Sequence, residues 1–407
     1  MSLPSQSKFQ VFTETYFMHL YHMAPVIDRA DLAVEQPSDL LILAISLIGS
    51  QLRYPRDQPP TLLSESYYLK IKTLLYAKHE HDKLAILKTL CILCFWVITP
   101  PVVVSLDSSY HWLGVAVRLA YQMGLHRESS YLKLSNPGAA RRLVWFIFCA
   151  DKLQAAAFGR PIFISSQSIN LRPLELEDFE SPDAKAETFI QFTNLNKLLE
   201  KIVEFQDRRP RHLMNKCGLW ILNSLKQWVA TLPSNLNLHN DSGRREYCRG
   251  IAELHIHYFT CIILFIHLYG HVINPSMMTD TSLVASSCMA RLYDEIDDHD
   301  EINYLTPVHN WSLMVGCIPQ IHRLGDIGLL SEEHDLCNTE LEIFVTALRC
   351  MRLKWPPANN ILSTLDRLRT SKFHPMLPED QSKVARPLVV LEGLFPFPRT
   401  CVPEWKW

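Results

Sequence analysis

The chain has 407 residues, of which 48% are hydrophobic and 20% charged, a composition typical of a globular protein with a large core. Its 40 basic and 42 acidic residues give a formal net charge of −2, which excludes the global positive field that drives sequence-independent binding to DNA. The 11 cysteines, an odd number set largely in apolar runs, and an N-terminus without a secretory signal indicate reduced thiols in an intracellular protein.

Helical periodicity dominates the chain, in which only 13 glycines are available for tight hairpins. Ser38 is a candidate N-cap residue, and Gly124 is a candidate left-handed residue that ends a helix, with Leu125 folding back behind it. Gly159 ends another helix in the same way, with Pro161 just beyond it. The predicted helices cover residues 9–23, 39–50, 64–79, 83–98, 109–123, 141–158, 187–207, 213–230, 246–271, 281–299, 307–327, 334–353 and 358–370.

Residues 163–184 interrupt this pattern as an irregular segment, and no part of the chain shows a set of alternating strands or an internal repeat. We therefore predict an all-α fold in which residues 1–370 form a single large helical domain of many packed helices. A helical hairpin around residues 109–160 is the expected core, and residues 163–184 are expected to join the two halves. The proline-rich tail, residues 371–407, is expected to pack on this domain or to extend from it.

One segment is apolar enough to require a test for membrane insertion. Thr89 to Leu106, "TLCILCFWVITPPVVVSL", has no charged residue over a length that could just span a bilayer. Pro100 and Pro101 lie within it and would break a helix. We therefore predict a buried helix that ends near Ile98 and a following loop, and no membrane partner.

Sequence motifs of common enzymes and metal sites are absent or incomplete. The chain contains no GxxxxGK[ST], GxGxxG, GxSxG or HExxH pattern. Cys91 and Cys94 form a CxxC in an apolar context without a second ligand pair, which favours structural thiols. In "ELHIHYFTCIILFIHLYGH", His267 and His271 have a workable metal spacing, but only Glu253 is available to add a carboxylate. We predict no metal site, no cofactor and no catalytic residue.

The acidic run at residues 294–301, "DEIDDHDE", supports a less favoured alternative. Asp297, Asp298 and Glu301 have the DDxxE spacing with which all-α terpene synthases bind magnesium, a hard cation that prefers oxygen ligands. Such enzymes need a second metal motif on a later helix, and none follows here. A solvated helix end is the simpler interpretation, and we expect that the chain is not an enzyme.

Two basic clusters could be nuclear-import patches or simply exposed junctions between helices and loops. The sequence leaves both interpretations open. The residues concerned are Arg208, Arg209, Arg211 and Lys216 in "DRRPRHLMNK", and Arg244, Arg245 and Arg249 in "GRREYCR".

The middle of the chain contains an ordered pattern of some fifty residues, "HWLGVAVRLAYQMGLHRES" followed by "RRLVWFIFCADKLQAAAFGRPIFIS". It resembles the fungal-specific transcription factor domain, the middle homology region of fungal zinc cluster and C2H2 transcription factors. One departure is Lys152, where the family usually has arginine after the aspartate. The positions that match the family signature are Trp112, Gly114, Ala116, Arg118, Ala120, Gly124, Leu125, His126, Arg127, Arg141, Arg142, Trp145, Asp151, Gly159, Arg160 and Pro161.

The resemblance implies an all-helical regulatory domain, a nuclear role with shuttling to the cytoplasm, and no catalysis. The first cysteine is Cys91, inside the domain, so the zinc-finger module of the family is missing. This indicates a stand-alone regulatory domain, a gene product that lost its finger, or a fragment. We expect a transcriptional regulator or co-regulator of a biosynthetic, secondary-metabolite gene cluster. Its expected partners are other regulatory proteins, including a DNA-binding subunit, with little intrinsic DNA binding; a helical domain that senses a small-molecule effector is the alternative.

Two charged signature residues lie in apolar helices. A buried charge must be paired or hydrogen-bonded, so we expect either that Arg118 and Asp151 meet across the helical hairpin or that each caps nearby backbone groups.

Overall fold

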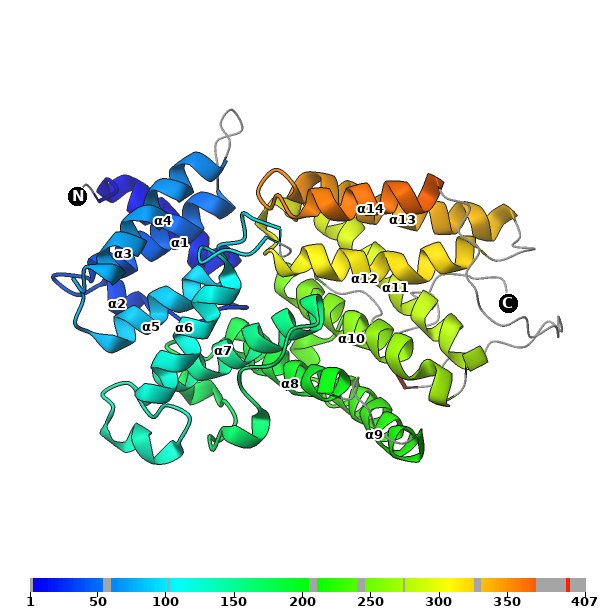
Figure 1. The fold of residues 1–407 in the computed structure, drawn as a ribbon, viewed down its shortest axis with the longest axis horizontal. Coiled ribbons are helices and arrows are strands. Elements are labelled where there is room, and N and C mark those ends of the chain that lie inside the picture. The colour runs from blue at the N-terminus through cyan, green and yellow to red at the C-terminus, as the bar shows by residue number, and fades with distance from the viewer. Residues whose placement is uncertain are drawn as a thin grey trace. The chain divides into compact units, whose positions relative to one another are not determined.

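Helices provide almost all regular structure in the computed structural model, which describes residues 3–53, 60–100, 103–204, 211–239, 246–273, 275–325, 331–370 and 393–395 (Figure 1). Within these residues the only β pairing is one isolated bridge between Arg127 and Asn170, so the all-α prediction is confirmed. The α-helices are α1 (Gln6–His19), α2 (Arg29–Leu32), α3 (Asp39–Leu52), α4 (Pro60–Tyr76), α5 (Lys83–Leu93), α6 (Ser109–Gln122), α7 (Pro137–Phe158), α8 (Ala184–Glu204), α9 (Arg211–Ala230), α10 (Arg249–Ile273), α11 (Pro275–Asp298), α12 (Val308–Leu324), α13 (Ser331–Met351) and α14 (Ala358–Thr370). The short 3-10 helices are η1 (Glu128–Lys133), η2 (Ser166–Ser168), η3 (Leu176–Asp178), η4 (Ser234–Leu236) and η5 (Ile302–Tyr304).

The long helices lie where the hydrophobic periodicity predicts them, and the differences are at their ends. The predicted helix at residues 83–98 ends at Leu93, after which Phe95 and Trp96 continue in tighter turns that bond to carbonyls three residues back. Helix α7 begins before Arg141, at Pro137, because the Asn136 side chain accepts a hydrogen bond from the Ala139 amide and proline suits the first helical turn.

The chain divides into two compact units. Unit 1 comprises Met1–Lys197, Asn303–Val308 and Met351–Pro357, and unit 2 comprises Leu198–Ile302, His309–Cys350 and Ala358–Trp407. The boundary lies inside α8 rather than in residues 163–184, which belong wholly to unit 1 and therefore do not join two halves as expected. The single domain over residues 1–370 stays a prediction. Of the predicted tail only residues 393–395 are described; there the Leu394 carbonyl accepts a 3.0 Å hydrogen bond from the Tyr258 hydroxyl in unit 2.

In unit 1, α3 is buried along almost its whole length because α1, α4 and α5 pack around it. Gly49 permits the close approach of α1, since a Cβ atom at Gly49 would lie 2.4 Å from the Cβ of Phe12. Helices α6 and α7 pack against each other and both contact α5, which confirms the hairpin predicted around residues 109–160.

Two later segments of the chain return to unit 1. The Trp355 indole donates a 3.1 Å hydrogen bond to the Leu305 carbonyl. The buried Lys354 ammonium donates to the carbonyls of Leu52, at 2.8 Å, and Asn303. These contacts hold residues 303–308 and 351–357 against the N-terminal helices.

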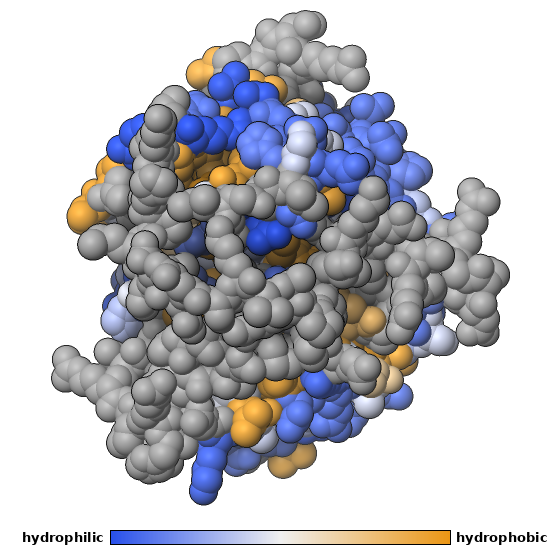
Figure 2. All heavy atoms as spheres, turned by 90° about the vertical axis from the view of Figure 1, so that its right-hand side faces the viewer, coloured by the Kyte–Doolittle hydropathy of each residue, from blue (hydrophilic) through white to orange (hydrophobic). Residues whose placement is uncertain are grey.

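In unit 2, α10 packs between α9 and α11. Over Arg249–Gly270 it is long and apolar enough to cross a membrane, but 78% of its apolar window is buried inside the protein. The segment from Thr89 to Leu106 is not one helix, as predicted. Among the described residues on the face drawn in Figure 2, hydrophobic side chains form separate patches between hydrophilic ones.

Candidate functional site

The two adjacent signature arginines lie in the first half of α7 and are both buried, with Arg142 only 1% exposed. The Arg142 guanidinium donates from Nε to the Pro25 carbonyl at 2.9 Å, from Nη1 to the Asp178 carbonyl, and from Nη2 to the Asp28 carboxylate at 2.5 Å. A single side chain thus joins α7 to the segment before α2 and to the end of η3.

Arg141 extends the same contacts toward the loop that follows α6. Its guanidinium donates to Asp178 Oδ1 at 2.6 Å and to the Glu128 carboxylate, and it lies 4.7 Å from the centroid of the Tyr131 ring. Arg172 supplies a second cation to Asp178, 2.8 Å from Nη1 to Oδ2. The charges are therefore compensated by several partners rather than by one isolated pair.

The N-terminal segment is held from its other side as well. Asp28 accepts a 3.0 Å hydrogen bond from the Tyr21 hydroxyl, and the Lys88 ammonium lies 2.5 Å from the Asp31 carboxylate. The Glu180 carboxylate accepts hydrogen bonds from the first backbone amides of α2. We call this set of contacts the polar network. It comprises Asp28, Asp31, Lys88, Glu128, Arg141, Arg142, Arg172 and Asp178.

The polar network explains why charges occur in an otherwise apolar helix. Its carboxylates accept hydrogen bonds from arginine and lysine side chains, so they are occupied by structural contacts rather than presented to a substrate. Sequence reasoning identified Arg141 and Arg142 but missed their partners, which lie between 13 and 117 residues away along the chain.

Asp151 and Lys152 form a second buried group farther along α7. The Asp151 carboxylate accepts hydrogen bonds from the backbone amides of Phe163, at 2.9 Å, and Ile164, at 3.1 Å. Lys152 donates to Asp151 at 3.0 Å and to the Ile164 carbonyl. Together they hold the residues after Gly159 against α7.

The expected pair between Arg118 and Asp151 is wrong, because Arg118 is exposed on α6 while Asp151 is occupied by backbone amides and Lys152. The alternative expectation, that each of the two caps nearby backbone groups, is confirmed for Asp151 and not for Arg118, which makes no hydrogen bond to a described residue. Arg118 lies on the helix face opposite Trp112 and Ala116, so helical spacing keeps it out of the core.

Gly124 ends α6 as predicted, with φ +73°. The Leu125 amide donates to the Ala120 carbonyl and the Gly124 amide to the Tyr121 carbonyl, the two hydrogen bonds of a Schellman motif. Gly159, with φ +61°, ends α7 in the left-handed conformation.

Replacing Gly114 in α6 and Gly124 at its end by alanine is expected to change the free energy of unfolding in opposite directions. Gly124→Ala should lower the free energy of unfolding by about 1–2 kcal/mol, because alanine is strained at positive φ. A Cβ atom there would also lie 2.9 Å from Ser130 Oγ. Gly114→Ala should raise the free energy of unfolding by up to about 1 kcal/mol, since α6 is helical there and alanine is the better helix former. Urea unfolding of both variants measures the difference, and a loss of stability in Gly114→Ala would contradict it.

The other signature residues near the polar network are also accounted for. The Trp112 indole donates to the Tyr68 hydroxyl at 3.2 Å, and the Trp145 indole to the Arg172 carbonyl at 3.3 Å. The backbone of His126 and its neighbours pairs with Asn170, and the His126 ring accepts a 3.0 Å hydrogen bond from Arg127 Nε. The pairing with Asn170 holds the loop after α6, whereas the Trp112 indole joins α6 to α4.

Arg160 and Pro161 follow α7 at the surface of unit 1. Pro161 is exposed, and the Arg160 guanidinium carbon lies 4.3 Å from the centroid of the Tyr110 ring. The end of the signature therefore places a cation against an aromatic ring at the surface of unit 1.

The described residues contain no group of three or more His, Cys, Asp or Glu that could hold a metal ion. Cys91 is buried, which raises the pKa of its thiol well above its usual range. His255 Nε2 lies 3.0 Å from the Leu236 carbonyl, whereas the side chain of His271 lies outside the described residues. His255 and His257 are core residues of unit 2, whereas His267 is exposed on α10.

His257 is expected to make unit 2 sensitive to acid. Burial, and then the nearby His309, hold the pKa of His257 at about 3, whereas the unfolded chain binds that proton near pH 6.5. The folded state binds fewer protons, so this stability is present above about pH 6.5 and is lost as the pH falls toward 3. Between about pH 7.5 and 5.5 the unfolding free energy should fall by about 1.4 kcal/mol more than in His257→Gln. Urea unfolding at both pH values measures this; identical pH dependence in the two proteins would contradict it.

The three carboxylates with the DDxxE spacing, at and just after the end of α11, are not jointly available to bind a metal ion. Glu301 accepts hydrogen bonds from the Tyr247 hydroxyl at 2.6 Å and from Arg249 Nη1 at 3.2 Å. Asp297 and Asp298 lie exposed at the last turn of α11. The missing ligand set gives no support to a magnesium-dependent terpene-type site.

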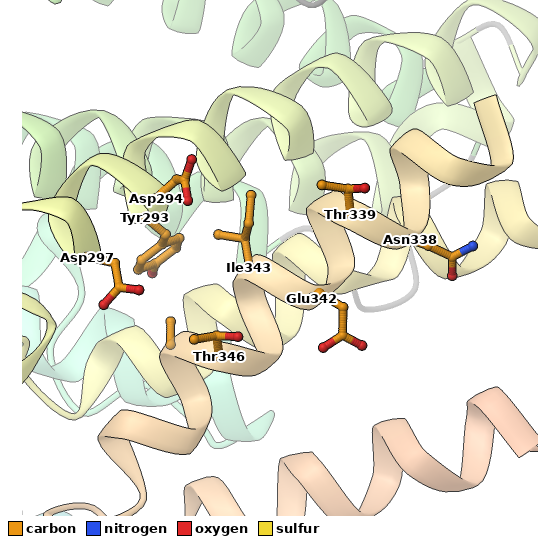
Figure 3. Close-up of a pocket in the computed structure, with 9 residues that line it drawn as sticks. Tyr293, Asp294, Asp297, Asn338, Thr339, Glu342, Ile343 and Thr346 are labelled. Atoms are coloured by element: carbon orange, nitrogen blue, oxygen red, sulfur yellow. The ribbon is translucent and has the colours of Figure 1, made fainter. Parts of the chain in front are cut away.

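Asp297 instead borders a surface cleft of about 510 Å³ between α11 and α13 (Figure 3). Burial, and then the charges of Asp298 and Asp297, raise the pKa of Asp294. The Glu342 carboxylate lies 2.6 Å from Arg369 Nη1. The cleft is lined by Tyr293, Asp294, Asp297, Asn338, Thr339, Glu342, Ile343, Thr346 and Ala347.

The two basic clusters are only partly described. Arg249 is buried and paired with Glu253, 2.8 Å from Nε to Oε1, so it does not belong to an exposed import patch. Lys216 is exposed on α9. The remaining basic side chains, those of Arg208, Arg209, Arg211, Arg244 and Arg245, lie outside the described residues.

Comparison with known proteins relates this arrangement to a family. The profile of the fungal specific transcription factor domain matches residues 13–297. The acetamidase regulatory protein of Aspergillus fumigatus is 25% identical over 325 residues, covering 75% of this chain and 41% of the relative. Cutinase transcription factor 1 alpha of Fusarium vanettenii is 21% identical over 357 residues, covering 79% of this chain and 39% of the relative.

A third relative matches a shorter part of the chain with a higher sequence identity. Cutinase transcription factor 1 beta of Fusarium vanettenii is 30% identical over 171 residues, covering 40% of this chain and 19% of the relative. The chain thus spans about two fifths or less of these curated relatives. No solved structure matches it.

Proposed function

The chain belongs to the fungal-specific transcription factor domain family, and from this premise we propose that it is a fungal transcriptional regulator or co-regulator acting through its helical domain and protein partners. The observation that carries the proposal is the family match over residues 13–297, which contains the whole signature block. The contacts of the signature agree with a regulatory scaffold, because its buried charges hold segments of unit 1 together.

A DNA-binding partner is part of the proposal. The formal net charge is −2, and the 407 residues contain no CxxC-based zinc cluster rich in lysine and arginine. The relatives are named as regulators of acetamidase and cutinase, which supports gene regulation in general. Action in the nucleus on a secondary-metabolite gene cluster is the finer proposal, which rests on family resemblance.

A tethering experiment tests the regulatory role directly. The chain is fused to a heterologous DNA-binding domain, and a reporter gene carries the binding sites for that domain. We expect reporter transcription to change several-fold relative to the DNA-binding domain alone. An unchanged reporter, with the fusion protein present in the nucleus at normal abundance, would exclude the proposal. RNA sequencing of a deletion strain then tests whether the affected genes include a biosynthetic cluster.

A second candidate function is regulation by a small-molecule effector, favoured by the cleft between α11 and α13. Its volume of about 510 Å³ lies in the range of ligand sites, and Thr339, Thr346 and Asp297 offer polar contacts. A thermal-shift screen with fungal metabolites tests it. The expected result is a compound that raises the melting temperature of the wild type but not of Thr346→Trp. Equal shifts in both proteins, or no shift with any compound, would remove this candidate.

A further inference from the structure

Three signature residues, Gly114, Arg118 and Arg160, lie with three aromatic residues on one face of α6 and at the end of α7, and all six are at least partly exposed. Tyr110, Gly114 and Arg118 are spaced four residues apart, so they lie one above another along α6. We call the surface that they form with the end of α7 the aromatic–arginine surface. Its members are Tyr110, Gly114, Arg118, Phe158, Arg160 and Phe163.

The aromatic rings and guanidiniums of this surface are in direct contact. The Phe163 and Tyr110 rings stack with their centroids 4.9 Å apart. The Arg160 guanidinium carbon lies 4.3 Å from the Tyr110 centroid and 5.0 Å from that of Phe158. Phe158 and Phe163 are nevertheless 41% and 40% exposed. Two large aromatic side chains therefore remain in part accessible to a partner.

Gly114 keeps this surface open. A Cβ atom there would lie 3.8 Å from Arg118 Nη2 and 3.8 Å from Phe163 Cζ, both ordinary van der Waals distances. The fold therefore does not require glycine at this position, although glycine weakens a helix interior. A glycine between the Phe163 ring and the Arg118 guanidinium leaves both groups accessible from above the helix. This points to contact with another molecule rather than to internal packing.

Arg118 gives the surface an exposed positive charge. Arg118 is exposed, and no ion pair involves it within the described residues. The carboxylate that precedes α6, Asp107, is occupied by Lys72 at 2.6 Å and by the Tyr68 hydroxyl at 2.5 Å. Guanidiniums next to exposed aromatic rings complement a ligand that combines carboxylates with apolar side chains.

We propose that the aromatic–arginine surface binds an acidic peptide segment of a partner protein, with a carboxylate on Arg118 and an apolar side chain against Phe163. This inference rests on the proposed function, since it states the chemistry of the protein partner. A nucleic acid backbone fits less well, because it needs a row of cations for successive phosphates and Arg118 is a single exposed guanidinium.

A direct binding experiment tests the surface with the purified chain. The probe is a fluorescent synthetic peptide of fifteen residues in which Asp and Glu alternate with Leu and Phe, and the readout is fluorescence anisotropy. We expect saturable binding that weakens with added salt. Arg118→Glu should raise the dissociation constant at least about tenfold, since a charge-assisted contact becomes a repulsion. Gly114→Leu should also weaken binding by covering the surface.

The matched control is Arg352→Glu, a charge reversal at another exposed residue of unit 1, which should leave the affinity unchanged. Circular dichroism confirms that all variants remain folded. The proposal is overturned if the wild type does not bind the peptide or if Arg118→Glu binds as tightly as the wild type. Equal binding of a peptide with Lys in place of the acids, or tighter binding of a DNA oligonucleotide that also depends on Arg118, overturns it as well.

This experiment is independent of the transcription assay. Peptide binding by the purified chain together with a silent tethered reporter would remove the regulatory function and leave the surface intact. A responsive reporter without peptide binding would remove the surface and leave the regulatory function intact.

Discussion

The Arg142→Leu variant is expected to lose about 3–5 kcal/mol of unfolding free energy, because removing one partner of a buried ion pair leaves the other charge unpaired. Asp28 is only 3% exposed, and the Pro25 and Asp178 carbonyls would lose a donor at the same time. The measurement is urea unfolding followed by circular dichroism. The polar network lies in unit 1 and Arg142 is part of α7. In the variant, the hydrogen-exchange rates of the α7 backbone amides should therefore increase more than those of other helices.

Arg352, which is exposed, provides the control for the stability loss expected in Arg142→Leu. Arg352→Leu removes the same side chain from the surface of unit 1 and should change the unfolding free energy by no more than about 0.5 kcal/mol. Equal effects at Arg142 and Arg352 would show that the buried contacts contribute nothing specific.

The Asp151→Ala variant is also expected to lose about 3–5 kcal/mol of unfolding free energy. It leaves the Lys152 ammonium buried without its counter-charge and removes the acceptor of the Phe163 and Ile164 amides. The unfolding free energy is measured as before. The additional change Lys152→Met should recover part of the loss, because it removes the unpaired charge.

The control for this prediction is Glu65→Ala, which removes an exposed carboxylate from α4 and should be nearly neutral. No recovery in the double variant, together with a small effect of Asp151→Ala alone, would contradict the assigned contacts.

Features with local causes could be predicted from the sequence. The end of α6 at Gly124 follows from a residue that adopts positive φ and an apolar residue behind it, and both are visible within a few positions. The helices follow from periodicity for the same reason. Only their ends differ, as at Asn136, whose capping side chain starts α7 before the first signature arginine.

The partners of the signature charges could not be predicted, because they are brought together only by the tertiary fold. Arg142 and Asp28 are 114 residues apart, and nothing in the local sequence of either identifies the other. The mistaken pairing of Arg118 with Asp151 has a different origin. The spacing of the buried residues Trp112, Ala116 and Ala120 already places Arg118 on the opposite face of α6.

The aromatic–arginine surface could be predicted only in part from the sequence. Gly114, Arg118 and Arg160 were identified as signature positions, but the exposure of Arg118 and the partial exposure of Gly114 and Arg160 follow from the packing of α6 and α7. Phe158 is the last residue of α7, and Phe163 follows where Asp151 fixes the course of the backbone. The buried signature residue Asp151 therefore holds Phe163 of the aromatic–arginine surface in place.

A double-mutant cycle between Arg142 and Asp28 tests most directly whether the signature charges are a structural scaffold. The unfolding free energies of Arg142→Leu, Asp28→Leu and the double variant are compared with that of the wild type. If these charges are a structural scaffold, the coupling free energy should be at least about 2 kcal/mol. The double variant should then lose less unfolding free energy than the two single variants lose together. Additive losses, with a coupling below about 0.5 kcal/mol, would contradict it.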